Sequence, residues 1–192
     1  MFQKVHDAFG GGSKVEEPFP ANRSPRVFLG GAYRLHHSDD VARFTELAAE
    51  AFPEFATRIT CLGADWAGNQ FATDEDRVVR AERQILLLEP GIGEVLQIPC
   101  GLDTFHDGIL VEEPDATAGY GFFQKWLAAG GAAPRYDECV GYKKPLFLGG
   151  ADEVSNLELG DFEVYWSVCG QVLSQVRSLP LGTRIGGVSV TD

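Results

Sequence analysis

The sequence predicts an α+β fold in which a mostly antiparallel sheet is covered by helices. Apolar residues recur at intervals of three or four over residues 38–55 and again after Asp161, which predicts two amphipathic helices. Between residues 58 and 100, short apolar segments are separated by glycine-containing turns, a pattern that is typical of β-hairpins. This order of a helix, strands, helices, a strand and a helix indicates one α+β domain.

Residues 1–37 are expected to form an N-terminal extension, and residues 38–192 a single domain. The segment GGGS at 10–13 and the prolines that follow it disfavour regular structure. Residues 27–35 could add a strand and a turn. We therefore expect this arm to pack against the main domain without a core of its own.

The first helix is expected to begin at Ser38 and to end by about residue 55. Serine is a favourable N-cap residue, and Asp39 and Asp40 suit the positive end of the helix dipole. Pro53 lies near the end of the apolar stripe and disfavours its continuation.

Four strands are expected to follow, over residues 58–66, 69–73, 84–90 and 94–100. Gly91, Ile92 and Gly93 separate the last two strands and predict a hairpin turn. Residues 85–88 are continuously apolar, which predicts a central strand that is covered on both faces. The acidic residues Asp74 and Asp76 lack the glycine and glutamate of a calcium loop, so we expect a solvent-exposed turn there.

The remaining elements are expected to be helical apart from one strand. Helices are predicted over residues 102–111 and 116–129, with Asp115 as a cap, and a strand and turn over 140–150. The last helix is expected to start near Asp161 and to end before Pro180. Gly170 lies inside it at a cost of about 1 kcal/mol relative to alanine, which indicates the close approach of another backbone.

The chain is strongly acidic, with 16 Lys and Arg against 28 Asp and Glu, a net charge of −12. This charge disfavours binding to nucleic acid and to anionic membrane surfaces, and it favours a basic partner. Residues 101–163 hold twelve of the acids and only four basic residues. Such a run forms either a solvated face or a face that binds a partner.

No sequence feature indicates export, membrane insertion or a cofactor. No apolar run approaches the ~20 residues of a membrane span, and the N-terminus lacks the apolar core of a secretory signal, so we expect a cytoplasmic protein. The cysteines are spaced too widely for paired zinc ligands or a compact disulfide framework. We expect reduced and mostly buried side chains at Cys61, Cys100, Cys139 and Cys169.

Reactive motifs are also lacking, so the sequence indicates no catalytic residue and no metal ligand. GGGSK at 10–14 has the wrong order for a phosphate-binding loop. The only His–carboxylate clusters are HHSDD at 36–40 and DTFHD at 103–107, where the aspartates also suit helix starts. One alternative function therefore stays open: a small metal-dependent hydrolase that uses His36, His37, His106 and nearby acids.

The segment CVGYKKPLFLGGADEVSNLELGDFEVYW at 139–166 resembles the C-terminal signature of the Tde-type immunity proteins of bacterial type VI secretion. The likeness extends to residue 185 through Gly170, Gln171 and LPLGTRI. Upstream, ADWAGNQFATD at 64–74 and ILLLEPGIGEVLQI at 85–98 are similar to the wider SUKH-like immunity superfamily. Relatives often carry a separate N-terminal module, for which residues 1–37 are too short.

The resemblance implies a SUKH-like domain in a non-catalytic immunity protein that binds and neutralises a cognate toxin, expected to be a nuclease. An acidic inhibitor would be steered to the basic groove of such an enzyme. The signature residues Pro145, Gly149, Gly150, Asn156, Tyr165 and Trp166 are expected to maintain the fold. The candidate toxin contacts are the acids least explained by helix capping: Glu112, Glu113, Asp137, Glu138, Asp152 and Glu153. A scaffold protein without a toxin is a further alternative.

Overall fold

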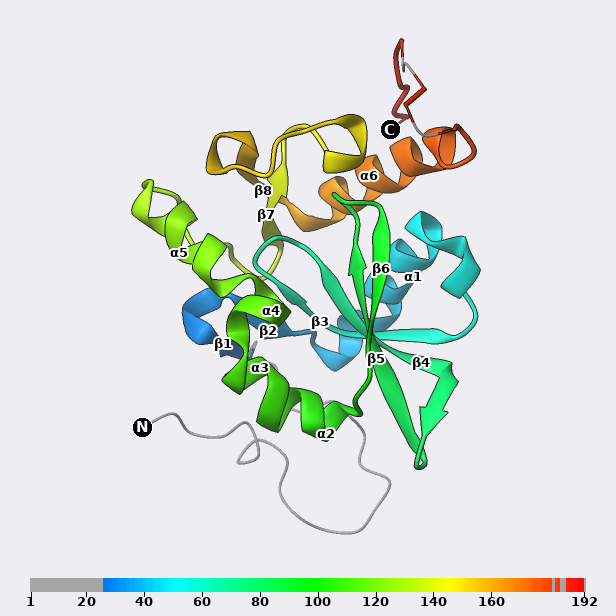
Figure 1. The fold of residues 1–192 in the computed structure, drawn as a ribbon, viewed down its shortest axis with the longest axis vertical. Coiled ribbons are helices and arrows are strands. Elements are labelled where there is room, and N and C mark those ends of the chain that lie inside the picture. Colours follow the sequence, from blue (N-terminus) through cyan, green and yellow to red (C-terminus); the bar gives the residue numbers. More distant parts are fainter. Residues whose placement is uncertain (1–25, 181, 184–185, 192) are drawn as a thin grey trace.

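The computed structural model describes residues 26–180, 182–183 and 186–191. Six antiparallel strands form a sheet in which each strand pairs with its sequence neighbours (Figure 1). This architecture confirms the α+β fold with a mostly antiparallel sheet. The strands are β1 (Val27–Phe28), β2 (Tyr33–Leu35), β3 (Ile59–Asp65), β4 (Gln70–Val79), β5 (Glu82–Glu89) and β6 (Glu94–Ile98).

Each face of the sheet packs on its own set of helices. Helices α1 (Val41–Ala51) and α6 (Phe162–Val176) cover one face, where Phe44 and Trp166 meet Leu86 and Leu88. The segment from Leu102 to Ala118 covers the other face, where Phe105 packs on Tyr33 and Phe71. Figure 1 shows these two helical layers on opposite sides of β3–β5. Ile85–Leu88 in β5 is buried as predicted, but β5 is next to the sheet edge and not central.

The extension predicted at residues 1–37 enters the sheet through its described part. Strand β2 pairs with β3 through Tyr33–Asp65 and Leu35–Gly63, and β1 pairs with β2. The expectation for residues 1–25 lies outside the described residues. The domain boundary after residue 37 stays a prediction.

The first helix begins later than predicted. Residues Ser38–Asp40 form a 3₁₀ turn, α1 starts at Val41, and Pro53–Phe55 form another 3₁₀ turn. Ser38 does not cap the helix. The Asp40 carboxylate is held by the Tyr136 hydroxyl at 2.9 Å and by Arg43 at 3.2 Å, so its oxygens serve tertiary contacts.

The turn predicted at Asp74 and Asp76 is wrong, because β4 continues to Val79, and of the two side chains only Asp76 is exposed. The Asp74 side chain has no exposed surface and accepts a charged hydrogen bond from Arg58 at 2.9 Å. Asp76 is 66% exposed and lies 3.1 Å from the same guanidinium. Arg58 therefore neutralises the buried carboxylate of Asp74, which was expected to be exposed to solvent.

The helical region after the sheet is interrupted twice. Helices α2 (Leu102–Thr104) and α3 (Leu110–Glu112) flank a π-helical turn over Phe105–Ile109. The single helix predicted over residues 116–129 is wrong, because α4 (Pro114–Ala118) and α5 (Tyr120–Ala128) are separate. Gly119 between them has φ +56°, a left-handed conformation that ends α4 and redirects the chain.

A second, two-stranded sheet lies beside the main one and was only half predicted. Strand β7 (Glu138–Tyr142) was expected, whereas β8 (Leu157–Asp161) was missed because its sequence, LELGD, has only one buried side chain. Asn156 holds the loop between them: its side chain accepts from Lys144 N and donates to Lys144 O and Ala151 O.

Helix α6 confirms several expectations. The Asp161 carboxylate caps it by accepting from Val164 N at 2.9 Å. A Cβ added at Gly170 would lie 3.2 Å from Ala51 Cα, which is the close backbone approach predicted for this glycine. Trp166 is buried and donates to Gly68 O at 2.7 Å, so it ties the helix to the turn after β3.

The four cysteines, Cys61, Cys100, Cys139 and Cys169, are all free and buried, as expected. Burial raises the pKa of the Cys61 and Cys169 thiols to about 12, which keeps both thiols protonated at neutral pH. Among the described residues, no helix has both the length and the apolarity that a membrane span requires.

Candidate functional site

A cleft of about 440 Å³ opens at one end of the main sheet. Its sides come from the end of β3 and the turn that follows, from the β5–β6 hairpin, from α4 and α5, and from Tyr142 and Asp152 near the second sheet. The cleft thus joins the two halves of the chain, and we call it the acidic cleft.

Part of the wall of the acidic cleft is apolar. Trp66, Leu87, Ile92, Leu96 and Phe122 line it. The Trp66 indole nitrogen donates to Ala118 O at 3.0 Å, which fixes the turn after β3 against α4. Packing of Trp66 on Phe122, with ring centroids 5.7 Å apart, joins the same turn to α5.

Four carboxylic acids and one lysine line the same space: Asp65, Glu89, Asp115, Asp152 and Lys125. Within the part of the chain that the structure describes, none of these five takes part in an ion pair. The cleft therefore carries an excess of negative charge without an internal cation paired to it.

Asp65 is the most buried of these acids. Its carboxylate accepts from the backbone and side-chain nitrogens of Asn69, both at 2.9 Å. Loss of hydration nevertheless raises its pKa to about 7, against the lowering effect of the Asn69 hydrogen bonds. The nearby Glu89 charge raises this pKa further, which shows that the two acids interact.

Glu89 and Tyr142 complete the charged wall. Burial raises the Glu89 pKa to about 7, and the neighbouring Glu94 adds to the shift. The Tyr142 hydroxyl donates to Asp152 at 2.7 Å. Burial raises the pKa of Tyr142, and the hydrogen bond to Asp152 and the charges of Asp152, Glu89 and Asp65 raise it further.

The chemistry of the acidic cleft suits a cation more than any other ligand. Carboxylates that have lost part of their hydration gain more from a positive charge than exposed ones do. The apolar walls suit the aliphatic stem of a lysine or arginine side chain. No group of three or more His, Cys, Asp and Glu that could hold a metal ion occurs among the described residues.

The six predicted contact residues do not form one cluster. Asp152 lines the acidic cleft, and Glu153 follows it on the exposed loop. Glu112 and Glu113 are exposed at the end of α3, directly before the cleft-lining helix α4.

The other two predicted contacts lie away from the cleft. Glu138 begins β7, about 13 Å along the strand from Tyr142, and Asp137 directly precedes it. Arg135 pairs with both of them, at 3.8 Å and 3.0 Å.

Sequence reasoning missed three members of the cleft. Asp65 and Glu89 end β3 and β5, which both pair with β4 and run in the same direction, so only the strand pairing brings the two acids to the same edge of the sheet. Asp115 was assigned to helix capping, and its carboxylate does accept a hydrogen bond from Gly121 N across the break between α4 and α5.

The histidines of the alternative hydrolase hypothesis are separate from one another and serve the fold. His36 is buried, lies 3.0 Å from Gln70 Oε1 and stacks on Phe44. His106 lies 2.9 Å from the Tyr33 hydroxyl, and His37 packs on Tyr136. Burial lowers the pKa of His36 to about 3 and that of His106 to about 4, so both are neutral at physiological pH.

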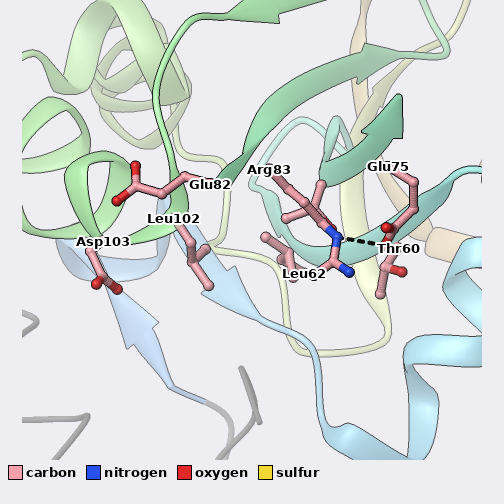
Figure 2. A pocket seen from close by; sticks show the side chains of 8 residues that line it. Thr60, Leu62, Glu75, Glu82, Arg83, Leu102 and Asp103 are labelled. Carbon is pink, nitrogen blue, oxygen red and sulfur yellow. Dashed lines mark ion pairs between the residues drawn. The ribbon is translucent and has the colours of Figure 1, made fainter. Parts of the chain in front are cut away.

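A second hollow, of about 270 Å³, lies on the same face at the opposite end of the sheet, and we call it the paired hollow. Thr60, Thr73 and Leu102 line it together with the charged residues Glu75, Glu82, Arg83 and Asp103. Figure 2 shows Arg83 directed toward Glu75, and the two form an ion pair at 2.7 Å.

Comparison with known proteins identifies the C-terminal part of the chain. Residues 101–173 match the model of the family described as T6SS immunity protein Tdi1, C-terminal. This match overlaps the signature at 139–166 and confirms the resemblance to type VI secretion immunity proteins. A comparison with curated proteins finds no match.

The solved structures include a similar fold. The crystal structure of Atu4351 from Agrobacterium tumefaciens superposes with a TM-score of 0.58 over 80% of this chain and 76% of that chain, at 17% sequence identity. This likeness confirms the fold. The matched segment 101–173 includes α4, α5 and the second sheet, which supply about half of the residues that line the acidic cleft. Over residues 101–173, the chain is therefore similar to the family described as T6SS immunity protein Tdi1, C-terminal.

Proposed function

We propose that this protein is a non-catalytic immunity protein that binds a toxin delivered by type VI secretion and neutralises it. The match of residues 101–173 to an immunity family carries the proposal. The toxin is a nuclease with a basic groove, and the immunity protein meets it in the cytoplasm with an acidic surface.

The charge of the chain supports a basic partner. The net charge is −12, and residues 101–163, which include the cleft-lining helices α4 and α5, hold twelve acids against four basic residues. An enzyme that grips a polyanion needs a positive groove, and a negative protein is attracted to that groove from a distance. An interface of this kind gives fast association that weakens as salt is added.

Among the six predicted contact residues, Asp152 and Glu153 are the strongest candidates. Asp152 faces the cleft and Glu153 is exposed beside it, whereas Asp137 and Glu138 already have Arg135 as a partner. Charge reversal at Asp152 and Glu153 should therefore weaken toxin capture more than charge reversal at Asp137 and Glu138.

Growth rescue tests the proposed function. The chain is co-expressed with the products of genes adjacent to its own, each under separate induction. Rescue of growth from one toxic product, together with its co-purification with the chain, is the expected result. Failure to rescue growth from any toxic neighbour would argue against an immunity function.

A further inference from the structure

Strand β6 is an open edge of the six-stranded sheet. It pairs with β5 on one side, and no other described strand pairs with its outer side. Alternate residues of an edge strand direct unpaired backbone N–H and C=O groups outward, where they can accept another strand. Leu96, in the middle of β6, is 47% exposed.

The open edge borders the acidic cleft directly. Leu96 pairs with Leu87 and Glu94 with Glu89, so these side chains lie on one face of the hairpin. Leu87, Leu96 and Glu89 line the cleft. A strand added beside β6 would place every second side chain on this same face, next to Leu96.

From this arrangement we propose that β6 binds an extended segment of a partner protein as a seventh strand, and that one arginine or lysine of that segment enters the acidic cleft. The inference rests on the proposed function, because it specifies how the toxin is held. Backbone pairing supplies affinity and the cleft supplies selection for a basic side chain.

The negative charge of the chain favours a basic partner segment over a second copy of the chain as the strand that pairs with β6. Pairing two β6 strands would bring Glu94 and the cleft carboxylates of both copies together, in molecules that each carry −12. Like charges across a strand pair are destabilising. A basic segment instead meets carboxylates that lack an internal ion pair.

The cleft has room for the side chain that the inference requires. Its volume of about 440 Å³ exceeds what one arginine side chain occupies, and its apolar wall can contact the aliphatic stem. The guanidinium would then meet Glu89 and Asp152, while Asp65 lies deeper and is already bonded to Asn69. Arginine pairs with carboxylates through two parallel hydrogen bonds, which gives geometric selection.

Synthetic peptides test both parts of the inference without knowledge of the toxin. The probe is acetyl-Thr-Val-Arg-Val-Thr-amide, titrated into the full ¹⁵N-labelled chain while the Trp66 indole and the Leu96 amide are followed by NMR. One comparison peptide has citrulline, the neutral analogue of arginine, in place of arginine. A second has N-methylated valines, which cannot donate backbone hydrogen bonds.

We expect saturable binding of the arginine peptide in the millimolar range, and at least about tenfold weaker binding of either comparison peptide. Equal binding of the arginine and citrulline peptides would overturn the role of the cleft. Equal binding of the N-methylated peptide would overturn strand pairing. Absence of any saturable shift at the two reporter groups would reject the whole inference.

Matched protein variants sharpen the test. The double variant Glu89→Gln/Asp152→Asn removes two cleft charges, and Glu46→Gln/Glu50→Gln removes two exposed charges from α1 on the other face. The first should lose at least about tenfold in affinity for the arginine peptide, and the second less than about twofold. Equal losses would mean that only net charge matters.

The toxin identified by growth rescue separates the inference from the function on which it rests. If the wild-type chain rescues growth and the cleft variant binds that toxin with unchanged affinity, the docking inference fails and the immunity function stands. If the chain rescues growth from no neighbour, the immunity function fails, whatever the peptides show.

Discussion

The acidic cleft and the paired hollow lie on the same face of one sheet, yet they differ in whether their carboxylates form ion pairs. In the paired hollow, Glu75 and Arg83 form an ion pair at 2.7 Å. In the acidic cleft, the described residues supply no ion pair to any of the four acids. Among the described residues, the paired hollow thus has one internal ion pair among its three acids, whereas the acidic cleft has none among its four.

The difference arises from where arginines enter the sheet. Arg58, Arg77 and Arg83 lie at the end of the sheet that holds the paired hollow, where β3 begins, β4 ends and β5 begins. Among the described residues that line the acidic cleft, Lys125 on α5 is the basic one. The arginine-rich end is the more stable arrangement, because a buried carboxylate without a partner lowers the free energy of unfolding. A site that keeps such a cost is a candidate for function.

Replacement of Asp74 by asparagine should give the largest loss of stability, because it breaks the most buried ion pair at the arginine-rich end. Asp74 is fully buried against Arg58, and Arg58 would keep its charge with one partner fewer. We expect the free energy of unfolding to fall by about 2–3 kcal/mol. Urea denaturation measures it.

Asp76→Asn is the matched control, since Asp76 pairs with the same guanidinium but is 66% exposed. That variant should lose less than about 0.5 kcal/mol. Similar losses in the two variants would contradict the view that burial gives the Arg58–Asp74 pair its importance.

The affinity of the acidic cleft for a basic partner should rise as pH rises. The pKa values of Asp65 and Glu89 are both raised to about 7, so both acids gain charge between pH 6 and pH 8. Affinity for the arginine peptide should rise about tenfold over this range. Other ionisable groups that line the cleft or interact electrostatically with these two acids are Tyr33, Arg34, Glu94, Asp115, Lys125, Tyr142 and Asp152.

The sign follows from linkage: a cation stabilises the ionised acids, so binding releases protons near neutral pH and is favoured as pH rises. NMR titrations at constant ionic strength measure the effect. In Glu89→Gln the rise should be smaller, because one of the two titrating acids is gone. An affinity that does not change between pH 6 and pH 8 would contradict the raised pKa values.

Glu89→Gln should stabilise the fold while it weakens binding. Because the pKa of Glu89 is raised to about 7, the folded chain holds its proton over a range where the unfolded chain has lost it. The free energy of unfolding therefore falls as pH rises from about 4.5 to about 7 and stays lower above it.

The glutamine variant avoids this loss, so it should be more stable than wild type by about 1 kcal/mol at pH 8, after allowance for the partial exposure of Glu89. At pH 4 the two proteins should unfold at the same denaturant concentration. A variant that is less stable at pH 8 would mean that the Glu89 charge has a partner in the folded chain.

Much of the fold could be predicted from sequence, whereas the site could not. The β5–β6 hairpin could be predicted, because the apolar run at residues 85–88 and the glycines of the Gly91–Gly93 turn are local features of the sequence. Strand β8 was missed because its four exposed residues carry no apolar alternation.

The acidic cleft was missed for a different reason. Asp65 and Glu89 are 24 positions apart and meet only through strand pairing and the turn after β3. Their raised pKa values come from burial by helices that lie later in the chain, which no local pattern records. Asp152 was predicted from charge alone, and its place beside Tyr142 depends on the loop that Asn156 holds.

Removal of the Glu75–Arg83 pair should have the smallest effect of all. Both side chains are about half exposed, at 48% and 55%, so water screens their attraction. Glu75→Gln should change the free energy of unfolding by less than about 0.5 kcal/mol. It should leave affinity for the arginine peptide unchanged, because the paired hollow lies at the far end of the sheet. Calorimetric unfolding and the same NMR titration measure both quantities. A large loss of binding in this variant would mean that the two hollows act as one surface, and that the ion pair at one end of the sheet and the unpaired acids at the other are not independent.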